Sequence, residues 1–293
     1  MTFTLKYGKS TAEVRSLGGE LISYKNDGIE YCWTGDADHW KGRAPVLFPV
    51  CCAPKDGVMA HNGVDYPMPR HGFARNKEFE PIYISKNKVI LEQRETDETL
   101  KMFPYCFSLR IDHEITENGF VTRYRVKNRD TNEMTFCIGG HPGFNCPLSE
   151  DDGGFEDYSL YFDDAEGCTV SITKDGYMDG SVPTVDCLKG TDELPLKYSD
   201  FDNDAMIVEN LPKKAVNLVS RRSGKGLRFV FDGFDALGLW TPIKKNSPFI
   251  CLEPWNGLPA DVEESTDAKS KKYAVSIGSG EEYTVAYSVE VIK

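Results

Sequence analysis

The sequence predicts an all-β protein, built as a large antiparallel β-sandwich or barrel. Two observations support this prediction. Apolar and polar residues alternate along several runs, and turn signals separate the runs at intervals too short for helices to intervene. No segment keeps a helical period for three turns, which disfavours alternating βαβ units. Residues 1–293 contain no internal repeat, low-complexity tract or linker, so we expect one domain.

Three runs show the alternation most clearly. Residues 107–113 carry Phe, Leu, Ile and His at odd positions and Ser, Arg and Asp at even positions. Residues 227–231 carry Leu, Phe and Phe at odd positions, and residues 283–291 carry only Tyr and Val at theirs. Side chains alternate between the two faces of a strand, so each run is predicted to be a strand with one buried face.

Turn signals lie between the predicted strands. They combine glycine with asparagine, aspartate, serine or lysine, and they occur at residues 26–28, 117–119, 174–176 and 223–226. Two polar stretches, residues 149–157 and 261–272, are predicted to be long surface loops because charged runs of this kind are usually solvated.

The chain is acidic, with a formal net charge of −12 at pH 7 and a sequence pI near 5.0. Nucleic acids and anionic membranes bind concentrated Lys and Arg, so neither is expected as a partner. The N-terminal segment lacks the pattern of a secretory signal, and no stretch approaches the roughly 20 apolar residues of a membrane span. We therefore expect a cytoplasmic monomer or homodimer whose ligand is a small molecule.

The nine cysteines do not suggest a disulfide framework, because their number is odd and their spacings are scattered. We expect reduced thiols, several of them in the core. A metal site is weakly indicated at best: Cys51 and Cys52 are adjacent, and His39 and His61 are near in sequence, but no Cys-x-x-Cys pair supplies zinc-ligand spacing. We therefore predict no metal.

His141 lies in the segment Gly-Gly-His-Pro-Gly-Phe-Asn of residues 139–145, directly after a strand-like run. Glycines at such a point let the backbone bend and a ligand approach closely. One interpretation is a histidine that is hydrogen-bonded at a strand end. The neighbouring Pro142, Phe144 and Asn145 favour a functional histidine instead.

Glu253 lies in the segment Cys-Leu-Glu-Pro-Trp-Asn-Gly of residues 251–257. Alternation predicts that it shares a strand face with Phe249 and Cys251, and a carboxylate there must be paired, hydrogen-bonded or shifted toward protonation. Trp255 offers a ring suited to the apolar face of a sugar. A structural glutamate at a sheet corner is an equally good interpretation from this segment alone. Together, a histidine and a glutamate presented in this way can form an acid/base pair.

The remaining histidines differ in their surroundings. His71 lies in a loop with Arg70 and Arg75, which could be a polar binding loop or a turn whose arginines face solvent. His113 lies on the apolar face of a regular strand and is predicted to be a core residue. The chain contains no Gly-x-Ser-x-Gly elbow, phosphate-binding glycine loop or dinucleotide fingerprint.

Taken in order, the segments resemble the aldose 1-epimerases, which are galactose mutarotase-like proteins, and among them the LacX-like branch. The matching segments span nearly the whole chain: residues 30–33, 39–49, 71–75, 96–99, 139–145, 201–205 and 253–255. The resemblance implies the galactose mutarotase-like supersandwich, with a sugar site on one concave sheet face. It also implies interconversion of sugar anomers without a metal or an organic cofactor.

The resemblance further implies roles for individual residues. His141 is similar to the family's general acid and Glu253 to its general base. His71 resembles a second histidine that contacts the sugar, and Asp204 resembles an acidic residue that binds sugar hydroxyls, although Asp202 would share its strand face. The resemblance also implies that two aromatic residues, Phe144 and Trp255, line the pocket.

The chain departs from the family pattern at Ala53, where relatives usually carry a sugar-binding arginine. Arg43, Arg70 or Arg75 could supply the missing guanidinium, and Arg70 and Arg75 could also bind the phosphate of a phosphorylated hexose. The departure keeps open a sugar-binding or sugar-sensing protein that lacks catalysis. A glycoside hydrolase is disfavoured, because its second carboxylate would have to come from Asp202 or Asp204 and the histidine would lack a role.

Overall fold

The computed structural model describes residues 1–178 and 185–293, and it confirms the all-β prediction. The described residues form strands and short 3₁₀ turns, with no α-helix among them. Accordingly, none of the described segments is a helix long and apolar enough to cross a membrane.

The largest sheet has nine strands and is antiparallel throughout. In spatial order its strands are β18 (Glu193–Pro195), β15 (Tyr158–Phe162), β20 (Ala215–Ser220), β21 (Gly226–Val230), β25 (Glu282–Ile292), β11 (Gly119–Asn128), β10 (Phe107–Ile115), β9 (Lys88–Arg94) and β8 (Glu80–Ile84).

A second sheet of eight strands carries the segments with His141 and Glu253. Its strands are β17 (Tyr177–Met178), β16 (Thr169–Lys174), β19 (Met206–Glu209), β22 (Ala236–Trp240), β23 (Phe249–Asn256), β13 (Ile138–Gly140) and β5 (Val46–Leu47), with β14 (Gly143–Asn145) also paired to β23.

Three smaller sheets and seven 3₁₀ turns complete the described fold. The sheets are β1 (Thr2–Tyr7), β2 (Ser10–Arg15), β3 (Glu20–Asn26) and β4 (Ile29–Glu30); β6 (Val58–His61) with β7 (Val64–Pro67); and β12 (Met134–Phe136) with β24 (Val275–Ile277). The 3₁₀ turns are η1 (Lys55–Gly57), η2 (Ala74–Asn76), η3 (Thr99–Lys101), η4 (Glu150–Asp152), η5 (Phe155–Asp157), η6 (Tyr198–Phe201) and η7 (Ala268–Ser270).

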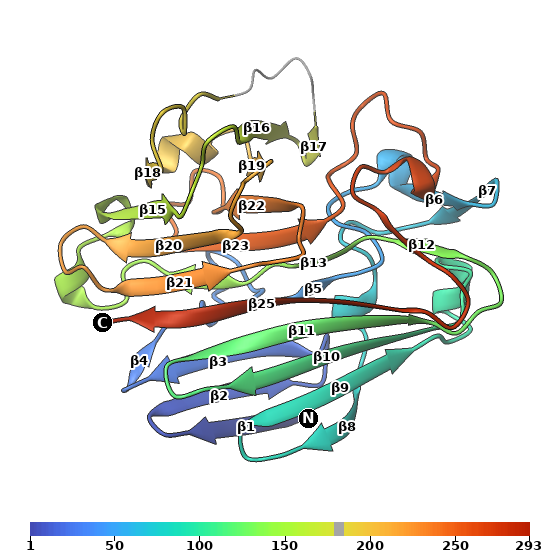
Figure 1. Ribbon diagram of the computed structural model, residues 1–293, viewed down its shortest axis with the longest axis horizontal. Helices are drawn as coiled ribbons and strands as arrows, with labels where there is room; N and C mark the ends of the chain where they lie inside the picture. The colour runs from blue at the N-terminus through green and yellow to red at the C-terminus, as the bar shows by residue number, and fades with distance from the viewer. Residues whose placement is uncertain (179–184) are drawn as a thin grey trace.

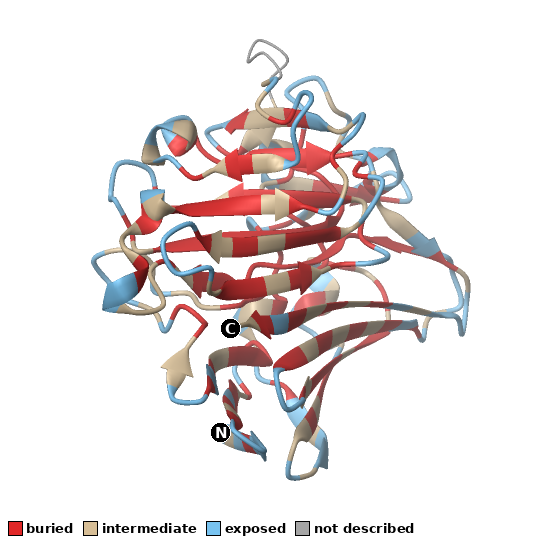
Figure 2. Ribbon diagram, turned by 60° about the vertical axis from the view of Figure 1, so that its left-hand side comes forward, coloured by how far each residue is buried: buried red, intermediate tan, exposed pale blue. Residues whose placement is uncertain are grey.

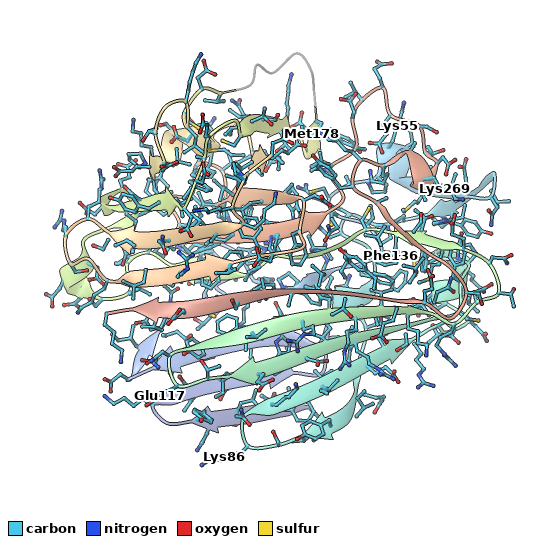
Figure 3. The ribbon with its side chains drawn as sticks, viewed as in Figure 1. Lys55, Lys86, Glu117, Phe136, Met178 and Lys269 are labelled. Atoms are coloured by element: carbon cyan, nitrogen blue, oxygen red, sulfur yellow. The ribbon has the colours of Figure 1, made fainter. Side chains whose placement is uncertain are left out.

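The main core lies on the inner face of the nine-stranded sheet. The eight-stranded sheet covers one half of that face and the β1–β4 sheet covers the other half (Figure 1). Aromatic pairs mark both contacts: Phe229 lies 5.8 Å from Phe144 of the eight-stranded sheet, and Phe120 lies 5.0 Å from Tyr24 of the smaller sheet. Side chains fill the space between the layers, with the labelled Phe136 among them (Figure 3).

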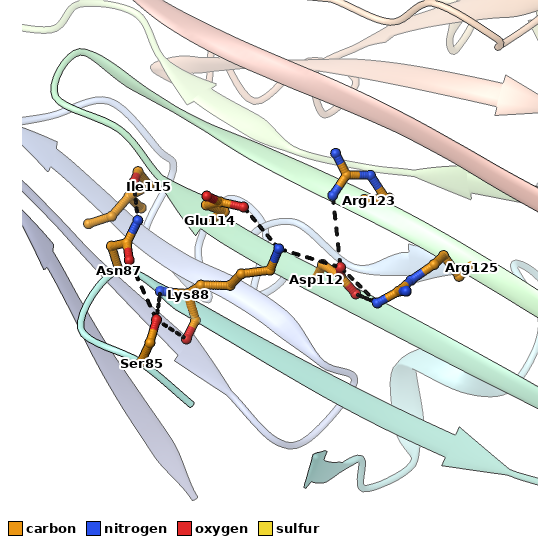
Figure 4. A network of polar contacts seen from close by, with 8 residues as sticks. All are labelled: Ser85, Asn87, Lys88, Asp112, Glu114, Ile115, Arg123 and Arg125. Atoms are coloured by element: carbon orange, nitrogen blue, oxygen red, sulfur yellow. Dashed lines mark hydrogen bonds and ion pairs between the residues drawn. The ribbon is translucent and has the colours of Figure 1, made fainter. Parts of the chain in front are cut away.

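The predicted alternation accounts for the burial pattern. Figure 2 shows strands banded between buried and partly buried residues, which is typical of a sheet with one covered face. The outer face of β9, β10 and β11 is polar. There the carboxylate of Asp112 accepts hydrogen bonds of 2.7 and 2.9 Å from Arg125 and lies 3.8 Å from Arg123, while Lys88 bridges toward Glu114 at 3.0 Å (Figure 4).

The predicted turns are confirmed, because each of the four joins two consecutive paired strands. The two predicted surface loops differ in part from the expectation. Residues 149–157 fold into η4 and η5 and bury Asp152 and Phe155, and residues 261–272 bury Lys271 against Glu264 at 3.2 Å. These loops are therefore anchored by buried side chains.

Candidate active site

The pairing of two strands brings His141 opposite Glu253. On one side of His141, Gly139 pairs with Trp255, and on the other side Gly143 pairs with Cys251. The register is the same before and after the interruption, so the residue facing His141 across the strands is Glu253. The Nε2 atom of His141 lies 3.3 Å from Oε2 of Glu253, and both side chains are buried.

Backbone hydrogen bonds on both sides fix the segment that carries His141. The His141 N–H donates to the carbonyl of Pro45 at 3.0 Å, and the Leu252 N–H donates to the carbonyl of Pro142 at 3.1 Å. Alternation along β23 places Glu253 on the face with Phe249 and Cys251, as predicted, while the intervening residues enter the main core. The pair thus lies on the face of the eight-stranded sheet that points away from the main core.

Glycines on this face make room for the indole ring of Trp255. A Cβ atom placed on Gly139 would lie 2.7 Å from the Trp255 ring, and one placed on Gly238 would lie 2.7 Å from its other end. Gly238 is also the direct partner of Glu253 on β22. The floor of the site therefore consists of glycine backbone, one large ring and the acid/base pair.

A cavity of about 650 Å³ opens above this floor. Most of the predicted site residues line it, although they come from segments far apart in the sequence. The predicted residues among its lining are Arg70, His71, Arg75, His141, Asp204, Glu253 and Trp255.

His71 presents a hydrogen-bond donor to the cavity. Its Nδ1 accepts a hydrogen bond of 3.0 Å from the backbone N–H of Cys52, so the neutral ring carries its proton on Nε2. Burial is the largest cause that lowers the pKa of His71 well below 6.5, with further lowering from His141, Arg75 and Arg70. His71 also adopts a left-handed backbone with φ of 64°, which costs roughly 1–3 kcal/mol and is typical of functional positions.

Gly72 anchors the loop that carries His71. Its φ is 70°, and a Cβ atom there would lie 2.0 Å from the carbonyl oxygen of Phe48. The same carbonyl accepts the N–H groups of Phe73 at 3.1 Å and Ala74 at 3.2 Å. A side chain at position 72 is therefore excluded, and the loop is held tightly against the chain before Cys52.

Two tryptophans that the sequence prediction missed form the aromatic walls. Trp40 stacks on the His141 ring at 4.8 Å with an interplanar angle of 26°, and Trp240 meets the same ring edge-on at 5.5 Å. Both line the cavity, as does His39, to which no role was assigned. Trp240 could have been found by alternation from Gly238 on β22, whereas nothing local to Trp40 indicates its position.

Charged groups surround the acid/base pair. Asp204 is buried, and its Oδ2 lies 3.9 Å from the half-exposed guanidinium of Arg70. Arg75 donates a hydrogen bond of 3.1 Å to the backbone carbonyl of Arg70, which ties the two arginines together. Asp202 is exposed and is not among the cavity residues, so of the two aspartates the structure brings Asp204 to the site. Neither lies on a strand, because β19 begins at Met206.

Burial sets the protonation of the pair. It is the largest cause that lowers the pKa of His141 to about 3, followed by the charge of Arg75. Burial also raises the pKa of Glu253 well above 4.5, although Arg70 acts in the opposite direction. In both residues, burial therefore acts against the charged form and favours the neutral form of the pair.

Phe144 does not line the cavity, which corrects the sequence prediction. It follows Gly143 on β14, so its side chain points to the opposite face and packs in the main core against Phe229 at 5.8 Å. Trp255 does line the cavity, as implied, but only 1% of its surface is exposed. Its ring therefore forms part of the floor and exposes little surface to a ligand.

Ala53 is not among the cavity residues either. Of the three arginines considered as replacements, Arg70 and Arg75 reach the cavity, whereas Arg43 donates to the carbonyl of Thr34. His113 is a satisfied core residue as predicted, because it bonds Thr122 at 3.0 Å and the carbonyl of Gly19 at 2.8 Å.

All nine cysteines are free thiols, as expected. One group of side chains could nevertheless hold a metal ion: the ligand atoms of His141, Cys251 and Glu253 lie within 4.8 Å of one another. The sequence prediction did not include this group, because its members come from two strands and lack a recognisable spacing.

Known proteins are similar to this chain over most of its length. A family model described as aldose 1-epimerase matches residues 1–276. The chromosomal LacX protein of Lactococcus lactis subsp. lactis is 38% identical over 286 residues, which cover 94% of this chain and 95% of LacX.

Two solved structures have the same fold. A galactose mutarotase-like protein from Lactobacillus casei superposes with a TM-score of 0.91 at 30% identity, and the match covers 100% of both chains. A galactose mutarotase related enzyme from Lactobacillus acidophilus has a TM-score of 0.93 at 24% identity, covering 100% of this chain and 98% of that chain. The strands therefore follow the galactose mutarotase-like fold that the sequence resemblance implied.

Proposed function

Because the chain belongs to the aldose 1-epimerase family, we propose that it interconverts the α and β anomers of a hexose, with His141 and Glu253 as its acid/base pair. The observation that carries this proposal is the 3.3 Å contact between Nε2 of His141 and Oε2 of Glu253 on the floor of the cavity. A cavity of about 650 Å³ has ample room for one sugar ring.

The reaction needs a base at the anomeric hydroxyl and an acid at the ring oxygen. Glu253 removes the hydroxyl proton while His141 protonates the ring oxygen, so the bond between C1 and the ring oxygen breaks and an aldehyde forms. Rotation about the C1–C2 bond exposes the other face of the aldehyde. Reclosure with the two roles reversed gives the other anomer and restores both groups.

The neutral form of the pair, which burial favours, already carries the proton that this mechanism needs. A protonated glutamate beside a neutral histidine holds the same number of protons as a carboxylate beside an imidazolium. Transfer across the 3.3 Å contact converts one state into the other without changing the net charge of the site. The charges of Arg70 and Arg75 favour the carboxylate, and so do sugar hydroxyls that donate to it.

The remaining cavity residues suit a polyhydroxylated ring. His71 offers an Nε2–H donor, Asp204 offers carboxylate acceptors, and the rings of Trp40 and Trp240 offer apolar surface for the C–H face of the sugar. Arg70 and Arg75 add donors in place of the arginine that is missing at position 53. They are also compatible with a phosphorylated hexose, because guanidinium groups bind phosphate well.

Polarimetry on freshly dissolved α-glucose, α-galactose and a hexose 6-phosphate tests the proposal. The protein should accelerate mutarotation of at least one of these sugars. Glu253→Gln and His141→Asn should each reduce that acceleration by about 100-fold or more, since one positioned acid or base contributes roughly 10²- to 10⁴-fold. Asp202→Asn, at an exposed position outside the cavity, is the matched control and should leave the rate unchanged. Undiminished activity in both active-site variants would refute the assignment.

A second function, sugar binding without catalysis, is favoured by one observation: Ala53 replaces the usual arginine and does not reach the cavity. It predicts a calorimetric binding signal for a hexose together with a mutarotation rate equal to that of buffer. If the unmodified protein accelerates mutarotation, sugar binding without catalysis is excluded.

A further inference from the structure

Three potential metal ligands converge beneath the aromatic walls. Cys251 and Glu253 share one face of β23, and His141 faces Glu253 from the neighbouring segment. Their ligand atoms, Sγ, a carboxylate oxygen and an imidazole nitrogen, lie within 4.8 Å of one another, and all three residues are buried. Among the described residues, Oε2 of Glu253 has no hydrogen-bond partner, although it is fully enclosed.

The distances suit a tetrahedral ion. With Zn–N and Zn–O bonds of about 2.1 Å, two such ligands of one tetrahedron lie about 3.4 Å apart. The observed 3.3 Å between Nε2 of His141 and Oε2 of Glu253 is close to that value. For a Zn–S bond of about 2.3 Å, the sulfur lies about 3.6 Å from each of the other two ligands. A sulfur no more than 4.8 Å from either ligand therefore moves by roughly 1.2 Å at most. Rotation of one cysteine side chain provides such a movement.

The charges also balance. A thiolate and a carboxylate together carry two negative charges, which neutralise a divalent cation and allow its burial. A sulfur ligand combined with an imidazole selects Zn²⁺ and related thiophilic ions over Mg²⁺ or Ca²⁺. Arg70 and Arg75 line the same cavity, so direct coordination has to overcome their repulsion of a cation.

We propose that His141, Cys251 and Glu253 form a binding site for a thiophilic divalent cation of the zinc type, and that the bound ion blocks the sugar site. The ligands are the thiolate of Cys251, the carboxylate of Glu253 and the lone pair of Nε2 of neutral His141. Any proton on the thiol or carboxyl group therefore leaves as the ion binds, and water from the cavity supplies the fourth ligand. The acid/base pair is occupied, so the ion is an inhibitor of the proposed reaction and not its cofactor.

Cobalt(II) is the probe for the site, because thiolate ligation gives a charge-transfer band in the near ultraviolet and tetrahedral geometry gives strong visible absorption. One equivalent of Co²⁺ should produce both signals in the unmodified protein, and Zn²⁺ should abolish them. Cys251→Ala should remove the thiolate band and weaken Zn²⁺ binding by about 100-fold or more, beyond the roughly 10- to 100-fold cost of losing an outer-shell partner. Cys106→Ala is the control, since Cys106 is a free cysteine that does not belong to this group of three ligands.

Cys251→Ser keeps the size of the side chain and covers the case in which the alanine variant does not fold. It should bind Co²⁺ without the thiolate band. A thiolate band that persists in either Cys251 variant, or the absence of that band from the unmodified protein, would overturn the proposal. The spectra do not depend on mutarotation, so they test the metal site even if the proposed function fails. If mutarotation is found, Zn²⁺ should inhibit it competitively with the sugar.

Discussion

The fit of Trp255 between two glycines leads to a prediction for Gly238→Ala. The new Cβ atom would lie 2.7 Å from Cη2 and Cζ2 of the indole and 3.2 Å from Cε2. Carbon atoms prefer separations of about 3.5–4.0 Å, so the ring has to move by roughly 1 Å. Movement toward β13 is blocked, because the other end of the ring already lies over Gly139.

Two costs follow from this displacement. Overpacking of a filled core typically destabilises a protein by about 1–3 kcal/mol, partly offset by the roughly 0.4–1 kcal/mol that Gly→Ala provides through the unfolded chain. We expect a net loss of about 1–2 kcal/mol in the free energy of unfolding. Gly238 pairs with Glu253, and a shift of about 1 Å near reacting groups can cost 100-fold in rate, so mutarotation should fall by about 10- to 100-fold.

Urea denaturation and polarimetry measure the two effects. The matched control is Gly154→Ala, because Gly154 has a φ of −120° and a Cβ atom there meets nothing within 4 Å. This control should be as stable as the unmodified protein or slightly more stable, with full activity. If Gly238→Ala behaves like the control in both assays, the argument that Trp255 fills the space between the glycines is refuted.

Three further predictions concern protonation and the aromatic wall. The mutarotation rate should stay level as the pH falls from 6.5 to 5. The reason is that the pKa of His141 is about 3, so the acid/base pair gains its second proton only near that pH. A rate that halves near pH 6.5 would contradict this prediction. Burial lowers the pKa of His113 to about 4, so the unfolded state binds more protons below pH 6.5. His113 should therefore cost about 1.4 kcal/mol of stability for each unit that the pH falls from 6.5 toward 4, and urea denaturation of His113→Gln should show a shallower dependence on pH. Trp40→Ala should admit water, raise the pKa of His141 and move the acid limb of the rate profile upward, whereas Trp40→Phe should keep the profile unchanged.

The strands and turns could be predicted from the sequence because both signals are local. Both depend on residues that are close together in the sequence. The three alternating runs fall on β10, β21 and β25, and the four turns join paired strands as predicted. The same alternation could have corrected one error. Side chains alternate between the two faces of a strand, so Gly143, two residues after His141, lies on the cavity face. Phe144 then lies on the opposite face, as it does in the structure.

The features that could not be predicted depend on contacts between distant segments. Trp40 reaches His141 from a loop about 100 positions earlier in the chain, and no local pattern encodes that contact. The protonation of Glu253 depends on how completely the fold removes water from it, which the residue types do not reveal. The metal-ligand set is likewise invisible until the register of β13, β14 and β23 is known.

The loop of residues 70–75 brings two guanidinium groups to the cavity. The His71 N–H donates to the carbonyl of Cys52 at 2.8 Å, and the Cys52 N–H returns a hydrogen bond to the His71 ring. These reciprocal hydrogen bonds are made by the residue immediately before Ala53, so they fix the loop to the segment that carries Ala53. Arg70 and Arg75 lie in or next to this anchored loop, and both line the cavity. The cavity therefore has positively charged groups from this loop, although position 53 carries only an alanine.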